Sequence, residues 1–361
     1  TGHSWSQIKT IVSPFPSRDK EACGDDLSRC KIGRESAWKE TKEAANNWNI
    51  ACEHTTFVAY EYSSFRLGSN LHRNVIFRNQ IVPDNPVSHI EAPHDYQLWE
   101  SLASDCLDAN TGCDVLAIPH NMNISNGRMF SLNYPNAWTR KAKAEMAELR
   151  MRLEPIIEIM QHKGDSECRN GLPGVQGGVD ELCDFEKMED AIYRNDEGEI
   201  KVGECYEGPG SHWLPRLGPS CLSRQSYART ALIEGLRQEQ KIGVNPFKFG
   251  ISASTDTHNA IGGAVSEDNF PGHLGKSDAT ISDRLSLESG KTGGISTNPG
   301  GLIGVWAEEN TRNAIFDAMQ RREVFGTSGP RMKVRLFGSW DFDEKLCSNP
   351  GTVSYTHLRA H

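Results

Sequence analysis

The stretch PIIEIMQH, residues 155–162, decides the fold class of this chain. It is an apolar run of strand length that ends on a polar residue, and the run DVLAIPH at 114–120 has the same pattern. Amphipathic helical patterns separate the apolar runs, at 136–153 and 224–240. Strands that are apolar on both faces and alternate with helices are typical of a parallel sheet covered by helices. We therefore predict an α/β protein, either a barrel or an open sheet.

Outward from these runs, weaker patterns predict the remaining elements and the limits of the domain. Further helices are expected at 36–48, 95–103 and 309–322, and further strands at 55–60, 72–78, 245–251 and 332–337. The expected organisation is an irregular segment at 1–35, a main domain at 36–345 with a loop-rich insertion at about 163–222, and a tail at 346–361. The last residues of that tail, SYTHLRAH, continue no pattern and are expected to be non-native.

Charge and hydropathy exclude two classes of partner. The 361 residues carry 39 basic and 48 acidic side chains, a formal net charge of −9. A nucleic-acid-binding surface requires a basic face, which this balance does not provide. No uninterrupted apolar stretch approaches the length of a bilayer span. We therefore expect neither a nucleic acid nor a membrane as partner.

The ten cysteines show no C-x-x-C spacing, which argues against a zinc ribbon and a thioredoxin-like site. Eight of them form near-neighbour pairs: Cys23 with Cys30, Cys106 with Cys113, Cys168 with Cys183, and Cys205 with Cys221. Bridges across such short polar segments would restrict the unfolded chain. They favour a periplasmic or secreted protein, whereas ten reduced thiols in a cytoplasmic protein remain the alternative. Of the other two cysteines, Cys52 is expected to be buried before a strand, and Cys347 has no near neighbour.

Polar residues able to bind metals follow the predicted strands. They are Glu61, His120, His162, Asp256 and His258. In α/β barrels and open sheets, functional sites form where the loops at the carboxyl ends of the strands converge. Asp256 and His258 are two residues apart, so in an extended segment both point to one side. Mixed nitrogen and oxygen donors suit zinc, manganese or iron. Such ions lower the pKa of bound water and thereby generate a nucleophile near neutral pH.

Other polar residues lie next to these candidates. Arg73, Arg128 and Lys163 could clamp an anionic phosphate or sulfate, or could be solvated surface cations. Asn121 could bond substrate oxygens or cap a turn. Glu158 lies inside its strand, four residues before His162, and we expect a buried, hydrogen-bonded carboxyl group there and not a ligand.

At these residues the chain resembles a known family. The segments are TTFVAYEYSS, NLHRNVIFRN, LAIPHNMNISNGRMF, PIIEIMQHKGDSE, NPFKFGISASTDTHN and GGLIGVWAEENTR. They resemble a bacterial family of unknown function that is similar to the PHP (polymerase and histidinol phosphatase) metal-dependent phosphoesterases. The resemblance implies a distorted seven-stranded β/α barrel with two or three divalent metal ions. It also implies that Glu61 is a bridging carboxylate and that the other four candidates are ligands. His72 precedes its strand, so it would either be a ligand or support one. The proton for the leaving group could come from His72 or from a metal-bound water.

The chain departs from the PHP pattern at its beginning. PHP proteins open with a His-x-His strand upstream of the residue equivalent to Glu61, whereas the first 60 residues here contain only His3 and His54. The resemblance therefore implies a barrel without its first two strands. The expected product is a fragment with an incomplete metal cluster, whose activity is in question.

Two functions remain open at this point. The first is a metal-dependent hydrolase that acts on a small anionic phosphate or related ester. The alternative is a non-catalytic, disulfide-braced domain that binds a metal or another ligand. The number of metal ligands distinguishes them, because a hydrolytic site keeps open coordination positions whereas a structural site is closed.

Overall fold

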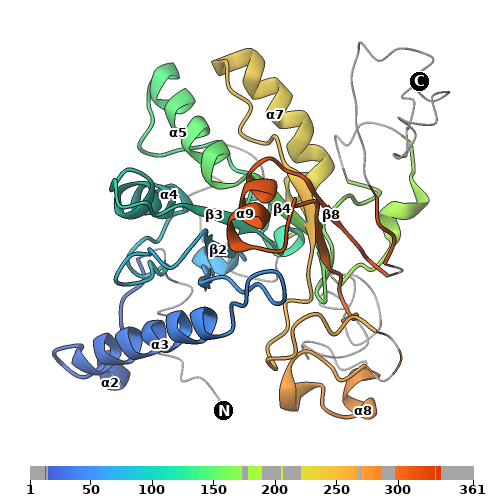
Figure 1. The fold of residues 1–361 in the computed structure, drawn as a ribbon. Coiled ribbons are helices and arrows are strands. Elements are labelled where there is room, and N and C mark those ends of the chain that lie inside the picture. The colour runs from blue at the N-terminus through green and yellow to red at the C-terminus, as the bar shows by residue number, and fades with distance from the viewer. Residues whose placement is uncertain are drawn as a thin grey trace.

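The computed structural model describes residues 13, 15–172, 178–188, 205, 221–266, 268, 270–286, 297–329 and 331–334. Three small β-sheets lie at the centre of the part that it describes, and the longer helices lie around them (Figure 1). The tail at 346–361 and Cys347 lie outside the described residues, as does most of the segment at 163–222 that was predicted to be an insertion.

The first sheet is antiparallel throughout. Its strands are β1 (Ala59–Tyr62), β2 (Arg73–Phe77) and β3 (Val115–Pro119), in the order β1-β2-β3. Alternate residues of β2 are fully buried, and two of them, Val75 and Phe77, belong to one apolar cluster with Trp38 and Trp99. Burial of this cluster fixes which face of the sheet points inward, because a one-residue slip would turn the apolar side chains to solvent.

The second sheet is mixed, and the third is a two-stranded ribbon. In the second, β4 (Ile156–Gln161) pairs in parallel with β6 (Gly250–Ala253) and antiparallel with β5 (Gly164–Asp165). The ribbon consists of β7 (Ile303–Val305) and β8 (Val324–Gly326). Strand β3 lies next to β4, and β6 lies next to β8, so the three sheets adjoin one another.

The predicted β/α barrel is therefore wrong: the described strands form small antiparallel and mixed sheets, with no closed barrel among them. A parallel return requires a crossover of a dozen or more residues. The connection from β1 to β2, residues 63–72, contains only a 3₁₀ turn at Arg66–Gly68, so β2 must run back along β1. An apolar run reveals that a strand is buried but not its direction, which is why the sequence suggested parallel pairing.

Seven α-helices lie among the described residues. They are α2 (Lys20–Cys23), α3 (Ser28–Asn47), α4 (Asp95–Leu102), α5 (Arg140–Leu153), α7 (Ala228–Ile242), α8 (Ile281–Arg284) and α9 (Arg312–Gln320). Helix α3 begins at Ser28, so the predicted irregular segment 1–35 contains helix where it is described. Thr139 caps the beginning of helix α5, and its side chain accepts a hydrogen bond from the backbone of Ala142. Met332–Val334, predicted as the start of a strand, form none.

A fully buried ion network joins β2, α4 and α5. Glu154 accepts hydrogen bonds from Arg73 Nε at 2.9 Å, from Arg150 Nε at 2.9 Å and from Trp99 Nε1 at 2.8 Å. Burial opposes ionisation of Glu154, but the two guanidinium groups hold the pKa of its carboxyl below the ordinary value. Buried charges are tolerated when they are paired in this way. The network anchors the beginning of β2, one residue after His72.

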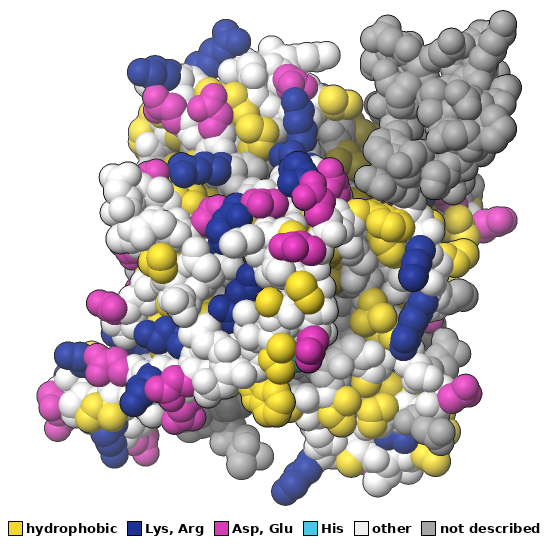
Figure 2. Space-filling view, viewed as in Figure 1, with side chains coloured by type: hydrophobic (Ala, Val, Ile, Leu, Met, Phe, Trp, Pro, Cys, Tyr) yellow, Lys and Arg dark blue, Asp and Glu magenta, His cyan; other side chains and the backbone are white. Residues whose placement is uncertain are grey.

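The four predicted cysteine pairs are confirmed as disulfides. They are Cys23–Cys30, Cys106–Cys113, Cys168–Cys183 and Cys205–Cys221. The prediction for Cys52 is wrong, because this free cysteine is exposed. Among the described residues, no helix combines the length and the apolar character needed to cross a membrane. On the face shown in Figure 2, Lys and Arg are intermixed with Asp and Glu and form no broad basic patch.

Candidate metal centre

One edge of the first sheet brings together Glu61, His72 and His120. Glu61 lies in β1, His72 directly precedes β2, and His120 directly follows β3. Because β2 is antiparallel to both neighbours, its beginning lies beside the ends of β1 and β3. The Glu61 carboxylate accepts hydrogen bonds from His72 Nδ1 at 2.7 Å and from His120 Nε2 at 2.9 Å. The three side chains therefore form one compact group, here called the first group.

The electrostatics of the first group favour an ionised carboxylate. Burial would raise the pKa of Glu61, but hydrogen bonds from the two histidines hold it well below its ordinary value. Burial lowers the pKa of His72, whose Nε2 is buried without a hydrogen-bond partner. The pKa of His120 is raised despite burial, because Glu61, Glu158 and Asp256 stabilise the imidazolium. A divalent cation could replace the protons on these nitrogens, and its positive charge would then balance the negative charge of the Glu61 carboxylate.

A second group forms where β4 and β6 end, and it consists of His162, Asp256 and His258. The two strands are parallel, so their carboxyl ends meet at one edge of the sheet. One donor atom from each of the three residues lies within 4.8 Å of the others. His258 Nδ1 donates to the backbone oxygen of Asp256 at 2.7 Å, which leaves Nε2 as the nitrogen with the free lone pair. Asp256 itself has φ of 52°, an uncommon conformation for a non-glycine residue.

His162 carries the strongest sign of a missing partner. Its ring is 1 % exposed, its Nδ1 has no hydrogen-bond partner among the described residues, and its Nε2 has only a long contact with Asp256. Burial lowers the pKa of His162 to about 4, so the imidazole is neutral at pH 7. Neutral imidazole is the form that binds metal ions. The Asp256 carboxylate lies 3.5 Å from His162 Nε2, and His162 and Lys163 hold its pKa well below the ordinary value although burial would raise it.

The two groups meet at the dipeptide His120–Asn121. His120 belongs to the first group, while the amide nitrogen of Asn121 donates to Asp256 of the second at 3.4 Å. Gln161 Nε2 also donates to Asp256, at 2.7 Å, and to the amide oxygen of Asn121. One peptide thus connects two histidine–carboxylate groups, both of which reach solvent through a partly exposed member, Glu61 or His258.

The residues present fit a divalent cation. Each group offers two imidazoles and one carboxylate, a donor set suited to zinc, manganese or iron. The buried, unpartnered nitrogens of His72 and His162 supply independent support, because buried polar groups in folded proteins almost always have a partner. All five predicted ligands therefore lie in one of the two groups, as does His72. His72 belongs to the first group because β2 is antiparallel, which its position before a strand did not indicate.

The four predicted substrate contacts lie in different environments. Arg73 is fully buried and engaged by Glu154, which places it in the core and not at a substrate surface. Asn121 connects the two groups, as described above. The ammonium group of Lys163 contacts Asp256 Oδ2. Arg128 is buried and donates from Nη1 to Ser69 Oγ at 3.2 Å.

Two residues that lie next to the second group, Gln161 and His273, were not predicted from the sequence. His273 is buried, and its ring centroid lies 5.4 Å from that of His162. Its Nε2 donates to the backbone oxygen of Pro299 at 2.9 Å, and its Nδ1 is buried without a partner among the described residues. The segment GHLG (272–275) lies in a loop far from any predicted strand. Its position therefore did not indicate that His273 is close to the candidate ligands.

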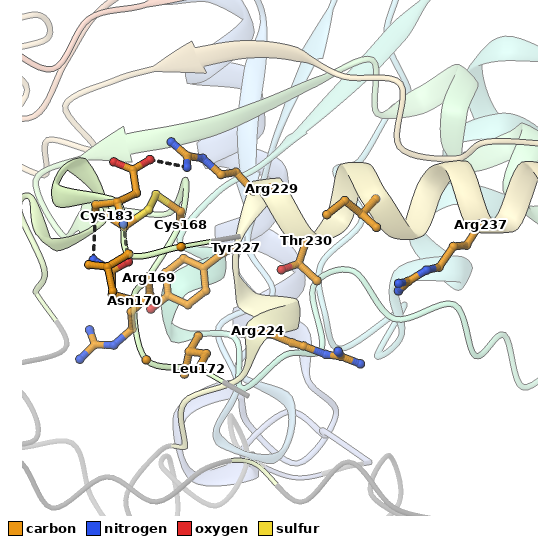
Figure 3. A pocket seen from close by; sticks show the side chains of 15 residues that line it. Cys168, Arg169, Asn170, Leu172, Cys183, Arg224, Tyr227, Arg229, Thr230 and Arg237 are labelled. Carbon is orange, nitrogen blue, oxygen red and sulfur yellow. Dashed lines mark hydrogen bonds and ion pairs between the residues drawn. A yellow bond between two sulfur atoms is a disulfide. The ribbon is translucent and has the colours of Figure 1, made fainter. Parts of the chain in front are cut away.

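A separate cavity of about 300 Å³ lies beside the Cys168–Cys183 bridge (Figure 3). Its described lining includes none of the six residues of the two groups. Arg229, at its wall, is bonded to Glu167 at 2.7 Å and to Asp180 at 2.6 Å. The charge of Arg229 is therefore already matched by carboxylates, and we assign no chemistry to this cavity.

Fold and site together define a disulfide-braced, mixed α/β protein with two adjoining histidine–carboxylate groups. The chain belongs to the family described as "Protein of unknown function (DUF3604)", whose model matches residues 3–360. The predicted membership of a family of unknown function is thereby confirmed. No curated protein and no solved structure gave a significant match.

Proposed function

We propose that this protein binds divalent cations at the two groups and hydrolyses a phosphate or related ester. The observation that carries the proposal is the junction at His120–Asn121, which sets two histidine–carboxylate groups side by side. When bound, such cations lower the pKa of water and polarise the ester oxygen. The surrounding segments resemble a bacterial family of unknown function that is similar to the PHP phosphoesterases, and we take this resemblance as support for the same chemistry although the described strands form no barrel.

The chain's own residues would have distinct tasks in that reaction. Glu61 and Asp256 supply the negative charge that holds the cations. His162 is a neutral nitrogen donor, because burial lowers its pKa to about 4. The Asn121 and Gln161 amides fix the orientation of Asp256, in the way that hydrogen-bonded neighbours commonly orient metal ligands. His72 keeps an unpartnered Nε2, from which it can coordinate a cation or exchange a proton with the leaving group.

The first test is metal content together with activity of the full chain. Elemental analysis after loading with zinc, manganese or iron should give two bound cations per chain. His162→Ala and His120→Ala should each lose one, while His54→Ala, a change at an exposed histidine, should lose none. Activity is measured on p-nitrophenyl phosphate, bis(p-nitrophenyl) phosphate and p-nitrophenyl sulfate. A chain that retains no cation after any loading refutes the proposal.

A non-catalytic metal-binding domain is the second candidate, and the four disulfides favour it. Bridges that close short loops make a rigid framework, as in many domains whose function is binding. One tightly held cation without activity on any of the three esters would select this candidate. Under either function, the four bridges support our proposal that the protein works in the periplasm or outside the cell, where disulfides persist.

A further inference from the structure

A small cavity is lined in part by residues that lie close to the first group in the chain. Its volume is about 60 Å³, and its lining includes Arg66, Leu71, Asp95 and Arg128. Leu71 directly precedes His72 in the chain. Phe65, which directly precedes Arg66, packs edge-on against the His72 ring with 4.4 Å between the centroids. The cavity wall therefore includes the chain neighbours of His72 and of Phe65, the residue that packs on its ring.

Arg66 is the unusual member of this lining. Its side chain makes no hydrogen bond or ion pair with any described residue, and its Nε is buried. Burial lowers the pKa of the Arg66 guanidinium, which means that the cation is incompletely solvated. The negative charge of Asp95 raises the pKa of Arg66 and so partly offsets the effect of burial. Asp95 already accepts a hydrogen bond from Arg73 Nη2, however, at 3.4 Å.

Asp95 lines the cavity together with the guanidinium groups of Arg66 and Arg128. Arg73 donates to Asp95 as well as to Glu154, and Arg150 donates to Glu154. Among the described residues, Arg66 is thus left without an ion pair of its own. A half-buried guanidinium without a counter-ion favours the binding of an anion, because the anion replaces the hydration that burial removes.

The turn that carries Arg66 is held in a strained conformation. Leu67 has φ of 54° and ψ of 33°, which is unusual for a leucine, and Gly68 follows with φ of 73°. Asn126 Nδ2 donates to the backbone oxygen of Gly68 at 3.1 Å and to Ser69 Oγ at 3.0 Å, and so pins the turn. Backbone strain of this kind clusters at functional sites and persists only where the surrounding structure enforces it.

We propose that the cavity at Arg66 is an anion subsite that takes a phosphate or sulfate group of the substrate. The inference rests on the proposed function and narrows its substrate class. None of the metal-ligand candidates lines the cavity, so the group bound there is not the ester under attack. The substrate is then an ester with a second, non-reacting oxyanion, which the guanidinium fork of Arg66 would hold through paired hydrogen bonds.

The test measures binding of inorganic phosphate and of inorganic sulfate to the metal-free full chain by calorimetry. Arg66→Gln should weaken the binding of at least one of these anions tenfold or more. Arg66→Lys, which keeps the charge but loses the fork, should give an intermediate affinity. Arg152→Gln is the matched control, since Arg152 is an exposed arginine paired with Asp108, and it should bind as the wild type does.

Three outcomes would overturn the subsite: no binding of either anion by the wild type, equal binding by Arg66→Gln, or equal weakening in Arg152→Gln. If Arg66→Gln fails to fold, equal binding by Arg66→Lys overturns it instead. Failure of the proposed function is read separately, from metal content. If the chain binds phosphate through Arg66 but retains no cation, the anion subsite is supported and the proposed hydrolase is refuted. If the chain retains cations but does not bind phosphate or sulfate through Arg66, the anion subsite is refuted and the proposed hydrolase is not.

Discussion

Replacement of Glu158 by Gln should remove a specific pH dependence of stability. Glu158 lies in β4 and is 3 % exposed; the Ser254 hydroxyl donates to its Oε2, while its Oε1 is buried without a partner among the described residues. Burial raises the pKa of this carboxyl from 4.5 to about 7. The native state therefore keeps a proton that the unfolded chain has already released between these two pH values.

The sign and the size of the effect follow from that difference. Where the native state binds the extra proton, the free energy of unfolding falls as pH rises. Each pH unit lowers the free energy of unfolding by about 1.4 kcal/mol, so the full interval of about 2.5 units amounts to about 3.4 kcal/mol. The loss of stability begins near pH 4.5, the pKa in the unfolded chain, and levels off just above pH 7, the pKa in the native state. The Gln variant has no titrating group at this position and should not show the loss.

The assay is urea unfolding of the metal-free wild type and of Glu158→Gln at pH 5 and at pH 7.5, with the disulfides intact. The free energy of unfolding of the wild type should fall relative to the variant by about 2.4 kcal/mol between the two pH values, because part of the full effect has already occurred at pH 5. Glu43→Gln, at an exposed helical position, is the control and should track the wild type. A difference between wild type and Glu158→Gln that is the same at both pH values would refute the reasoning.

Three further predictions concern the buried ion network at Glu154, the Cys168–Cys183 disulfide and His273. Glu154→Gln should lower the free energy of unfolding by about 3–5 kcal/mol in urea titrations at pH 7, because it leaves buried guanidinium groups without their carboxylate; a change below 1 kcal/mol would contradict this. Replacing both Cys168 and Cys183 by Ala, which opens a bridge across 15 residues, should cost about 3 kcal/mol in the same assay, and an unchanged midpoint would count against it. His273→Ala should weaken zinc binding by about 10–100-fold in competition with a chelator, the range found for neighbours of metal ligands; unaltered affinity would exclude His273 from the site.

Local features of the chain were predictable from the sequence. The cysteine pairs are separated by 7 to 16 residues, so their bonding depends little on the rest of the fold. The apolar runs that predicted the strands at 114–118 and 155–160 correspond to β3 and β4 within a residue. Helix positions were also recovered, although the ends shifted, as with α3 at Ser28. These features depend on spacing and burial, which the sequence displays directly.

Features that depend on strand direction were not predictable. His72 seemed misplaced because it precedes its strand, yet an antiparallel β2 brings it to Glu61 at 2.7 Å. Arg73 looked like a substrate contact because it adjoins a candidate ligand. Its side chain instead points into the core, where Glu154, 81 residues later in the chain, accepts its hydrogen bond. Such partners are distant in the sequence and leave no periodic pattern.

The sequence by itself determined which residue types were available for a metal centre and which segments had to be buried. Only the tertiary structure decided that those residues divide into two groups, that His120–Asn121 joins them, and that Arg66 has no ion pair with any described residue. The physical reason is that burial is a property of each segment, whereas charge balance and strand direction depend on how distant segments pair.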